Sequence, residues 1–152
     1  MTHARRTIRE AVVATLIAAS TAAGARVYDH PYSPRKTFPA LVVEDVGANF
    51  SDGNVTESQS QLDVAGIHFE RRYRFAVIAE IQQSDQAARE RDDLAAEVEI
   101  AVAAASIAGV QSINPIAYQA ADSNEGDKPI RRGLQVFEAI YVTAAGDPAT
   151  PI

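Results

Sequence analysis

Six polar side chains between residues 52 and 63 follow the spacing of calcium-loop ligands, the nearest approach to a reactive motif in this sequence. They are Asp52, Asn54, Thr56, Ser58, Ser60 and Asp63. The sixth position of such a loop should be glycine but is Glu57, and the last ligand should be a bidentate Glu but is Asp63. We therefore expect a solvated polar loop and no bound metal.

The remaining residues show no spacing typical of catalysis. A nucleophile elbow, a phosphate-binding loop, a dinucleotide fingerprint and a zinc-binding helix motif are all missing from the sequence. It contains no cysteine, and its three histidines, His3, His30 and His68, are scattered. No Asp or Glu pairs with a histidine at a spacing that sequence alone can support. We expect a protein that is not an enzyme and needs no cofactor.

Two groups of arginines could contact phosphate or form salt bridges. Arg71, Arg72 and Arg74 form the first group, and Arg131 and Arg132 form the second. Acidic residues are abundant, with 20 Asp and Glu against 14 Lys and Arg, for a formal net charge of −6. We therefore expect these arginines to form salt bridges across strands or between subunits. A chain that is acidic overall is also unsuited to gripping nucleic acid.

These side chains must be positioned by a long central strand over residues 69–82, FERRYRFAVIAEIQ, where apolar and polar residues alternate with a period of two. Arg71 is the one misfit on the apolar side, at a strand start or a bulge. Fourteen extended residues span about 46 Å, which overhangs a small domain. The ends of this strand therefore point to an assembly.

The residues before the central strand predict a helix, two short strands and a long loop. Residues 3–23 have the apolar spacing of an amphipathic helix, although three arginines before AVVATLIAAS also resemble a secretion signal. Strands follow at 26–29 and 38–46. The polar stretch 47–63 is a long loop or a protruding hairpin with Asp52-Gly53 at its tip. No apolar run is long enough to span a membrane.

The residues after the central strand predict a second helix and two more strands. The helix begins near Ser84 or Asp85 and ends near residue 108. A strand over residues 112–121 contains Pro115, which indicates an edge or a bulge. The last strand, 134–143, is apolar on both sides, with Val136 on one and Phe137 and Tyr141 on the other. Because a strand of this kind is covered on both faces, another subunit could supply the second cover.

Together these elements predict one α+β domain over residues 1–145 and a flexible tail at 146–152. Two helices pack on one face of a mainly antiparallel sheet. Their order resembles that of the tail terminator proteins of long-tailed bacteriophages, the lambda-type minor tail protein U group. The likeness is carried by RRTIREAVVATL, FPALVVEDVGANF, FERRYRFAVIAEIQQ, SDQAARERDDLAAEV and LQVFEAIYVT, which together span roughly residues 5–143.

The resemblance implies a structural virion protein, made in the host cytoplasm, that forms a ring of six-fold symmetry at the head-proximal end of the tail. Its partners would be further copies of itself, the tail tube protein and a head completion or neck protein. DNA would pass through the ring without specific binding. The family offers no catalytic residues to transfer. Position alone suggests these residues for subunit or tube contacts: Phe50, Asp52, Asn54, Arg72, Arg74, Asp127, Arg131, Arg132, Phe137 and Tyr141.

Two alternatives stay open at this point. A neck or head-tail connector subunit of similar topology would bind the portal side and not the tube. A small ligand-binding α+β domain would need polar groups that converge on an apolar pocket.

Overall fold

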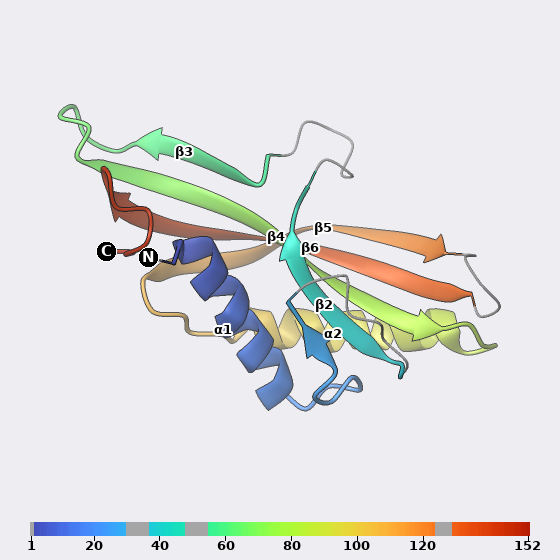
Figure 1. The fold of residues 1–152 in the computed structure, drawn as a ribbon. Coiled ribbons are helices and arrows are strands. Elements are labelled where there is room, and N and C mark those ends of the chain that lie inside the picture. Colours follow the sequence, from blue (N-terminus) through green and yellow to red (C-terminus); the bar gives the residue numbers. More distant parts are fainter. Residues whose placement is uncertain (1, 30–36, 48–54, 124–128) are drawn as a thin grey trace.

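The computed structural model describes residues 2–29, 37–47, 55–123 and 129–152. In this part of the chain, two helices and a six-stranded sheet form an α+β fold (Figure 1). The elements in chain order are α1 (Ala4–Ala18), β1 (Val27–Tyr28), β2 (Ala40–Asp45), β3 (Glu57–Gln61), β4 (His68–Gln82), α2 (Ala87–Ala103), β5 (Val110–Ser123) and β6 (Ile130–Ala144). The predicted α+β class, with a mainly antiparallel sheet, is confirmed.

Strand β4 is the centre of the sheet. Along one edge it pairs with β6 over its whole length, from His68 to Gln82. Its other edge is shared, because residues 69–73 pair with β3 and residues 75–80 pair with β2. These pairings are antiparallel, as is that of β5 with β6, whereas β1 pairs with β2 in parallel. Every strand of the sheet is therefore linked to β4 directly or through one neighbour.

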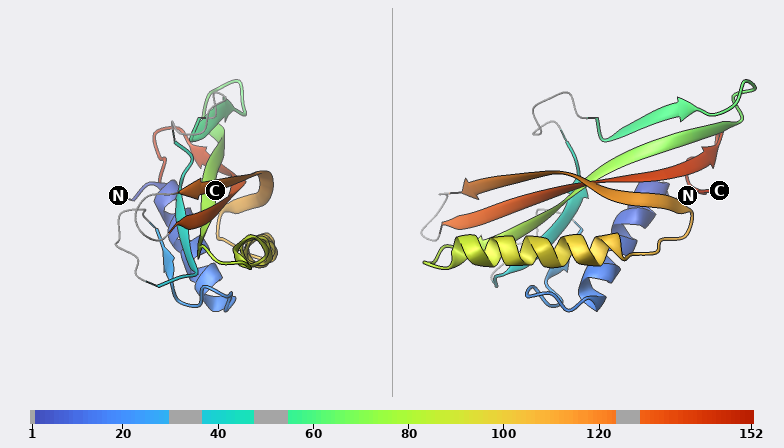
Figure 2. Two further views of the ribbon diagram at one scale, coloured as in Figure 1. Left: turned by 90° about the vertical axis from the view of Figure 1, so that its right-hand side faces the viewer. Right: turned by 180° about the vertical axis from the view of Figure 1, so that it is seen from behind.

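Both helices cover the same face of the sheet, as predicted. The amphipathic spacing of α1 buries Ala4, Ile8, Val12 and Leu16, and α2 buries Leu94, Val98 and Val102. Alternate residues of β4 and β6 meet these side chains in one core cluster. Its aromatic centre is a stack of Phe75 on Tyr73 and on Phe137, with ring centroids 5.6 and 5.5 Å apart. Figure 2 shows α2 lying along the long strands and α1 crossing beside it.

The opposite, outer face of the sheet is partly buried by the chain itself. Val42, Val46, Ala76, Ile78 and Val136 form a second buried cluster, against which Leu134 packs. Val136 is only 3% exposed, whereas Ile140 and Val142 of the same face are half-buried. The predicted cover by another subunit is thus not needed at Val136. It stays a prediction for the outer end of β6.

Strand β5 is an edge strand with a bulge, as Pro115 predicted. The register with β6 shifts between Pro115 and Ala117 and again between Val110 and Ser112. Proline lacks a backbone donor, so an irregularity on an edge strand accommodates it without loss of a central ladder bond. Side chains from Asn114 to Ala120 are exposed.

The β3–β4 hairpin, Glu57 to Arg74, is called the arm below. It lies at one end of the sheet and reaches past α2 (Figures 1 and 2). Its turn, called the tip, consists of Leu62 to Ile67. The protruding hairpin was expected to turn at Asp52-Gly53, which lies outside the described residues. Within the described residues, the turn falls at Asp63–Gly66, where Gly66 has φ +67° and its N–H donates to Asp63 O.

The C-terminal segment lies beside the outer end of β6. Pro151 forms an isolated bridge with Thr143, Ile152 N donates to Val142 O, and Ala4 N donates to Pro148 O. The segment thus joins the start of α1 to the end of β6. The flexibility of residues 146–152 and the domain limit at residue 145 stay predictions. Neither described helix has the length and apolar character needed to cross a membrane.

Candidate assembly surface

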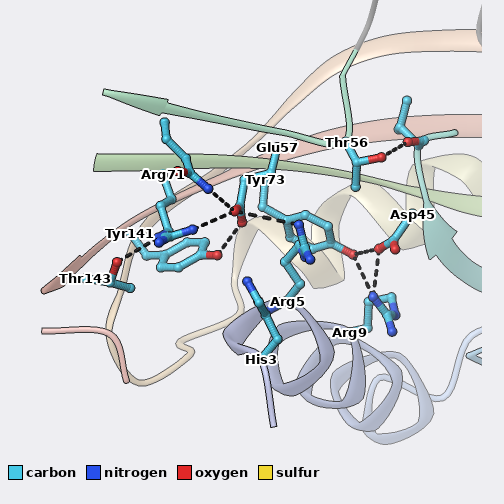
Figure 3. Close-up of polar contacts among 12 residues, drawn as sticks. His3, Arg5, Arg9, Asp45, Thr56, Glu57, Arg71, Tyr73, Tyr141 and Thr143 are labelled. Carbon is cyan, nitrogen blue, oxygen red and sulfur yellow. Dashed lines mark hydrogen bonds and ion pairs between the residues drawn. The ribbon is translucent and has the colours of Figure 1, made fainter. Parts of the chain in front are cut away.

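A buried carboxylate fastens the arm to the body of the subunit. The side chain of Glu57 in β3 is only 2% exposed. Its oxygens accept hydrogen bonds from Arg71 Nη1 at 3.0 Å and from the Tyr141 hydroxyl, and Arg5 Nη1 of α1 lies 3.7 Å away (Figure 3). Arg71 also donates through Nε to Thr143 Oγ1 at 2.7 Å. One network therefore joins α1, β3, β4 and β6.

A second carboxylate makes a neighbouring group of contacts one turn further along α1. Asp45, at the end of β2, accepts from the Tyr73 hydroxyl at 2.5 Å and from Arg9 Nη1 at 2.7 Å, both at Oδ1 (Figure 3). Arg9 is the next turn of α1 after Arg5. Two successive turns of α1 thus each contact a carboxylate that comes from the sheet. The contacts fix the angle at which α1 crosses the sheet.

The first residue of this helix interface is His3, the N-cap of α1. Its Nδ1 accepts from Arg5 N at 3.2 Å, which satisfies a backbone donor of the first turn. Burial, and next the positive charge of Arg5, lower the pKa of His3. A lowered pKa favours the neutral ring, which is the form that can accept at Nδ1.

The charged groups at the centre of the network already have partners within the protein. Both oxygens of Glu57 are taken by donors of the protein, and Arg71 bonds to two partners. Ionised groups out of water are costly unless they are paired and hydrogen-bonded, and here they are. Among the described residues, no group of three or more His, Asp or Glu side chains could hold a metal ion. What this geometry does is hold the arm in a fixed direction.

The phenols of the network give it a testable dependence on pH. Burial, followed by the bond to Asp45, raises the pKa of Tyr73, and burial, followed by the bond to Glu57, raises that of Tyr141. The unfolded chain then loses phenol protons above about pH 10 while the folded chain keeps them. Stability conferred by both phenols is fully present below that pH and is lost as the pH rises towards the folded values. We expect the free energy of unfolding in urea to fall between about pH 9 and about pH 11.5. The fall should be shallower for Tyr73→Phe/Tyr141→Phe, and an unchanged slope would contradict this assignment.

The arginines of the outer face form salt bridges within the chain, as expected. Arg72 pairs with Glu70 at 2.9 Å and with Glu138 at 3.5 Å, and Arg74 pairs with Glu138 at 3.1 Å. The two pairs with Glu138 connect β4 to β6 at the base of the arm. They are partly exposed, so each contributes at most about 1 kcal/mol.

The second arginine pair lies at the other end of the sheet. Arg132 bonds to Glu80 at 3.2 Å, and Arg131 donates to Gln83 Oε1 at 2.7 Å. Eight residues of β4 separate Glu80 from Arg72, a distance of about 26 Å in a strand. The structure therefore does not bring the two arginine groups together. A contact role for either group remains a prediction.

Two of the predicted contact residues are core residues, which corrects the expectation that they are available on the surface. Phe137 and Tyr141 are both 0% exposed. They lie on the helix side of β6, where Phe137 stacks on Phe75 and Tyr141 reaches Glu57. The expectation failed because β6 is apolar on both sides, so its alternation does not show which side the helices cover. Phe50, Asp52, Asn54 and Asp127 lie outside the described residues.

The sequence interpretation missed the buried carboxylate Glu57 and the hydrogen bond between Tyr73 and Asp45. One signal did exist, because Arg71 stands on the apolar side of an otherwise alternating strand. A buried guanidinium requires a buried carboxylate, but nothing in the sequence shows which acidic residue supplies it. Glu57 seemed part of a solvated loop and is in fact a strand residue opposite Tyr73.

Comparison with known proteins adds a structural relative. No protein-family model and no curated protein match this sequence. Among solved structures, the chain is similar to a protein in the structure of the virion of a native gene transfer agent particle. This chain shares the fold of that virion protein. The TM-score is 0.59, the sequence identity is 17%, and the alignment covers 88% of this chain and 92% of the other.

The extent of the match includes nearly the whole of both chains, so the shared fold is a complete domain and not one shared motif. At 17% identity the similarity establishes the fold and leaves the biochemical role to be proposed.

Proposed function

We propose that this chain is a structural virion subunit, a tail terminator that assembles into a ring on the head-proximal end of a phage-like tail. The observation that carries the proposal is the fold shared with a gene transfer agent virion protein over 88% of the chain. The sequence resemblance to tail terminators supports the finer assignment. In this role the ring stops further tube subunits from adding and presents a docking surface for a head completion or neck protein.

The stiffness of the arm supports an assembly role. The β4 strand of the arm pairs with β3 along one edge and with residues 139–144 of β6 along the other, so the arm is part of a three-stranded sheet. Here the Glu57–Arg71 pair, the Tyr141 hydroxyl and Arg5 of α1 fix it to the subunit. A pre-ordered projection loses less conformational freedom on binding, which favours association. The arm is therefore suited to contact a neighbour in a ring.

The charge of the chain supports a ring through which DNA passes. The net charge is −6, and the exposed side of α2 carries these carboxylates: Glu90, Asp92, Asp93, Glu97 and Glu99. Basic side chains would release counterions from DNA and hold it. An acidic surface lets a duplex slide past. The proposed ring thus handles DNA without specific binding.

The proposal predicts that the protein caps tail tubes. Purified protein is mixed with tubes polymerised from the tail tube protein and imaged by negative-stain microscopy, with tubes alone as the control. We expect a ring at one end of each tube and shorter tubes when the protein is present during polymerisation. Rings that bind only heads would indicate a connector. A monomer that binds a small metabolite and ignores tubes would contradict a virion role.

A further inference from the structure

The tip of the arm displays apolar side chains to solvent. Val64 is fully exposed, and Leu62 and Ile67 are 52% and 53% exposed. These residues lie within one turn of six residues and so form a single convex patch. Single exposed apolar residues are ordinary, whereas three on one projecting turn indicate a contact surface.

Hydrogen bonds hold this turn in one shape. Asp63 accepts from Ile67 N at 2.7 Å through Oδ1 and bonds to His68 Nδ1 at 2.8 Å through Oδ2. Gln61 Nε2 donates to Asp63 O, and Leu62 N donates to His68 O at 3.0 Å. The polar atoms of the turn are thus used internally while the apolar side chains point out. A turn of this kind is pre-organised for binding.

A concave apolar site lies elsewhere on the subunit, between the end of α1 and the second half of α2. This groove of about 230 Å³ is lined by Ala19, Ser20, Thr21, Glu97, Ile100 and Ala101. Ile100 at its rim is 72% exposed. Glu97 Oε2 accepts from Ala22 N at 2.9 Å, which holds the segment after α1 against α2. One water molecule occupies about 30 Å³ in the liquid, so a groove of this volume has room for a branched aliphatic side chain.

The tip and the groove cannot meet within one subunit. In Figure 1 the tip projects at the upper left, next to β3, whereas the groove lies at the lower end of α1, on the helix side of the sheet. A ring needs two different, complementary surfaces on each subunit, related by a rotation that closes. A convex apolar tip and a concave apolar groove, well separated on the same chain, fulfil this requirement.

The polar groups of both surfaces already have partners within the subunit, which is compatible with the same pairing. The one carboxylate of the tip, Asp63, bonds to Ile67 N and to the imidazole of His68, and Glu97 in the groove accepts from Ala22 N, so neither carboxylate depends on a partner from the neighbouring copy. A second groove, between α2 and β5, is less suitable because Asp92 and Glu99 line its mouth.

We propose that the tip of each subunit docks into the α1–α2 groove of a neighbouring copy, with Val64 against Ile100. The proposal rests on the proposed ring and specifies the contact that closes it. Each subunit gives its tip to one neighbour and receives the tip of the other. The contact is heterologous, so it can continue around a ring until the ring closes.

Disulfide cross-linking tests the contact, because the natural sequence has no cysteine. Val64→Cys/Ile100→Cys is assembled, with or without tubes, and oxidised. We expect a ladder of covalent oligomers on a non-reducing gel, ending at the ring. A mixture of the two single variants, Val64→Cys and Ile100→Cys, should give covalent dimers and no longer products. Each subunit then carries one cysteine, which can join only a cysteine that lies next to it. The matched control is Val64→Cys/Ile116→Cys, which pairs the tip with an exposed apolar residue of β5 and should yield at least tenfold less product.

The outcomes separate this inference from the proposed function. Normal rings of the cysteine variant without tip-to-groove product would overturn the docking contact and leave the ring standing. A control pair that cross-links as well as the test pair would also overturn it. Cross-linked dimers from a protein that never forms rings would support the contact and contradict the proposed function. Circular dichroism confirms that the variants are folded, as their exposed positions lead us to expect.

Discussion

Replacing Arg71 with methionine is expected to lower the free energy of unfolding by about 3 to 5 kcal/mol, because it leaves the buried Glu57 carboxylate without its main partner. The Glu57 side chain is 2% exposed and bonds Arg71 at 3.0 Å. Methionine fills a similar volume, so the loss reports the charge and not a cavity. Urea unfolding at neutral pH measures the effect.

The matched control is Arg72→Met, one residue further along the same strand. Arg72 points to the outer face, where its side chain is 47% exposed, so its loss should cost less than about 1 kcal/mol. The double variant Glu57→Gln/Arg71→Met leaves no buried charge unpaired. We therefore expect the double variant to recover part of the free energy of unfolding that Arg71→Met alone loses. Equal effects of Arg71→Met and Arg72→Met would show that the network does not fasten the arm.

Phe137→Ala should cost a similar amount, about 3 to 5 kcal/mol, because it opens a cavity in the centre of the core. Phe137 is 0% exposed and stacks on Phe75 with ring centroids 5.5 Å apart. Thermal or urea unfolding of the variant measures the loss. A useful comparison is Ile116→Ala on β5, where the side chain is 45% exposed and the loss should be below about 1 kcal/mol.

The effect of Phe137→Ala also shows whether this side chain lies in the core of the subunit or contacts another subunit. If Phe137 contacted another subunit, its loss would weaken assembly and leave the isolated subunit stable. The structure predicts the reverse order of effects, with the isolated subunit destabilised first. A Phe137→Ala subunit as stable as the natural protein would contradict its place in the core.

The sequence predicts those helices and strands in which one face is buried, because burial of one face places apolar residues at a regular spacing. The alternation of residues 69–82 matches β4, which the structure extends by one residue to His68. Pro115 marks the β5 irregularity because a missing N–H is a local property. Both helices are predicted but end early. Helix α1 ends at Ala18 and not at residue 23, and the backbone N–H of Ala22 donates to Glu97 of α2. Helix α2 ends at Ala103 and not at residue 108.

Tertiary partners decide what the sequence pattern leaves open. Strand β3, with the sequence ESQSQ, has no apolar alternation, because it is an edge strand whose order comes from pairing with β4. The same pairing brings Glu57 to Arg71, which are 14 residues apart. The side of β6 that faces the helices is likewise set by packing. The sequence predicted a protruding hairpin over residues 47–63 with its tip at Asp52-Gly53, which lies outside the described residues. The hairpin of residues 57–74, with its turn at Asp63–Gly66, was not predicted, because it depends on the register of β3 against β4.

The central claim is that identical copies of this chain close a ring on the end of a tail tube. Electron microscopy of tubes incubated with the purified protein tests it most directly, through averaged end views of the tube ends. We expect one ring of six-fold symmetry at a single end of each tube. Bare tube ends at saturating protein, or copies distributed along the tube wall, would contradict it.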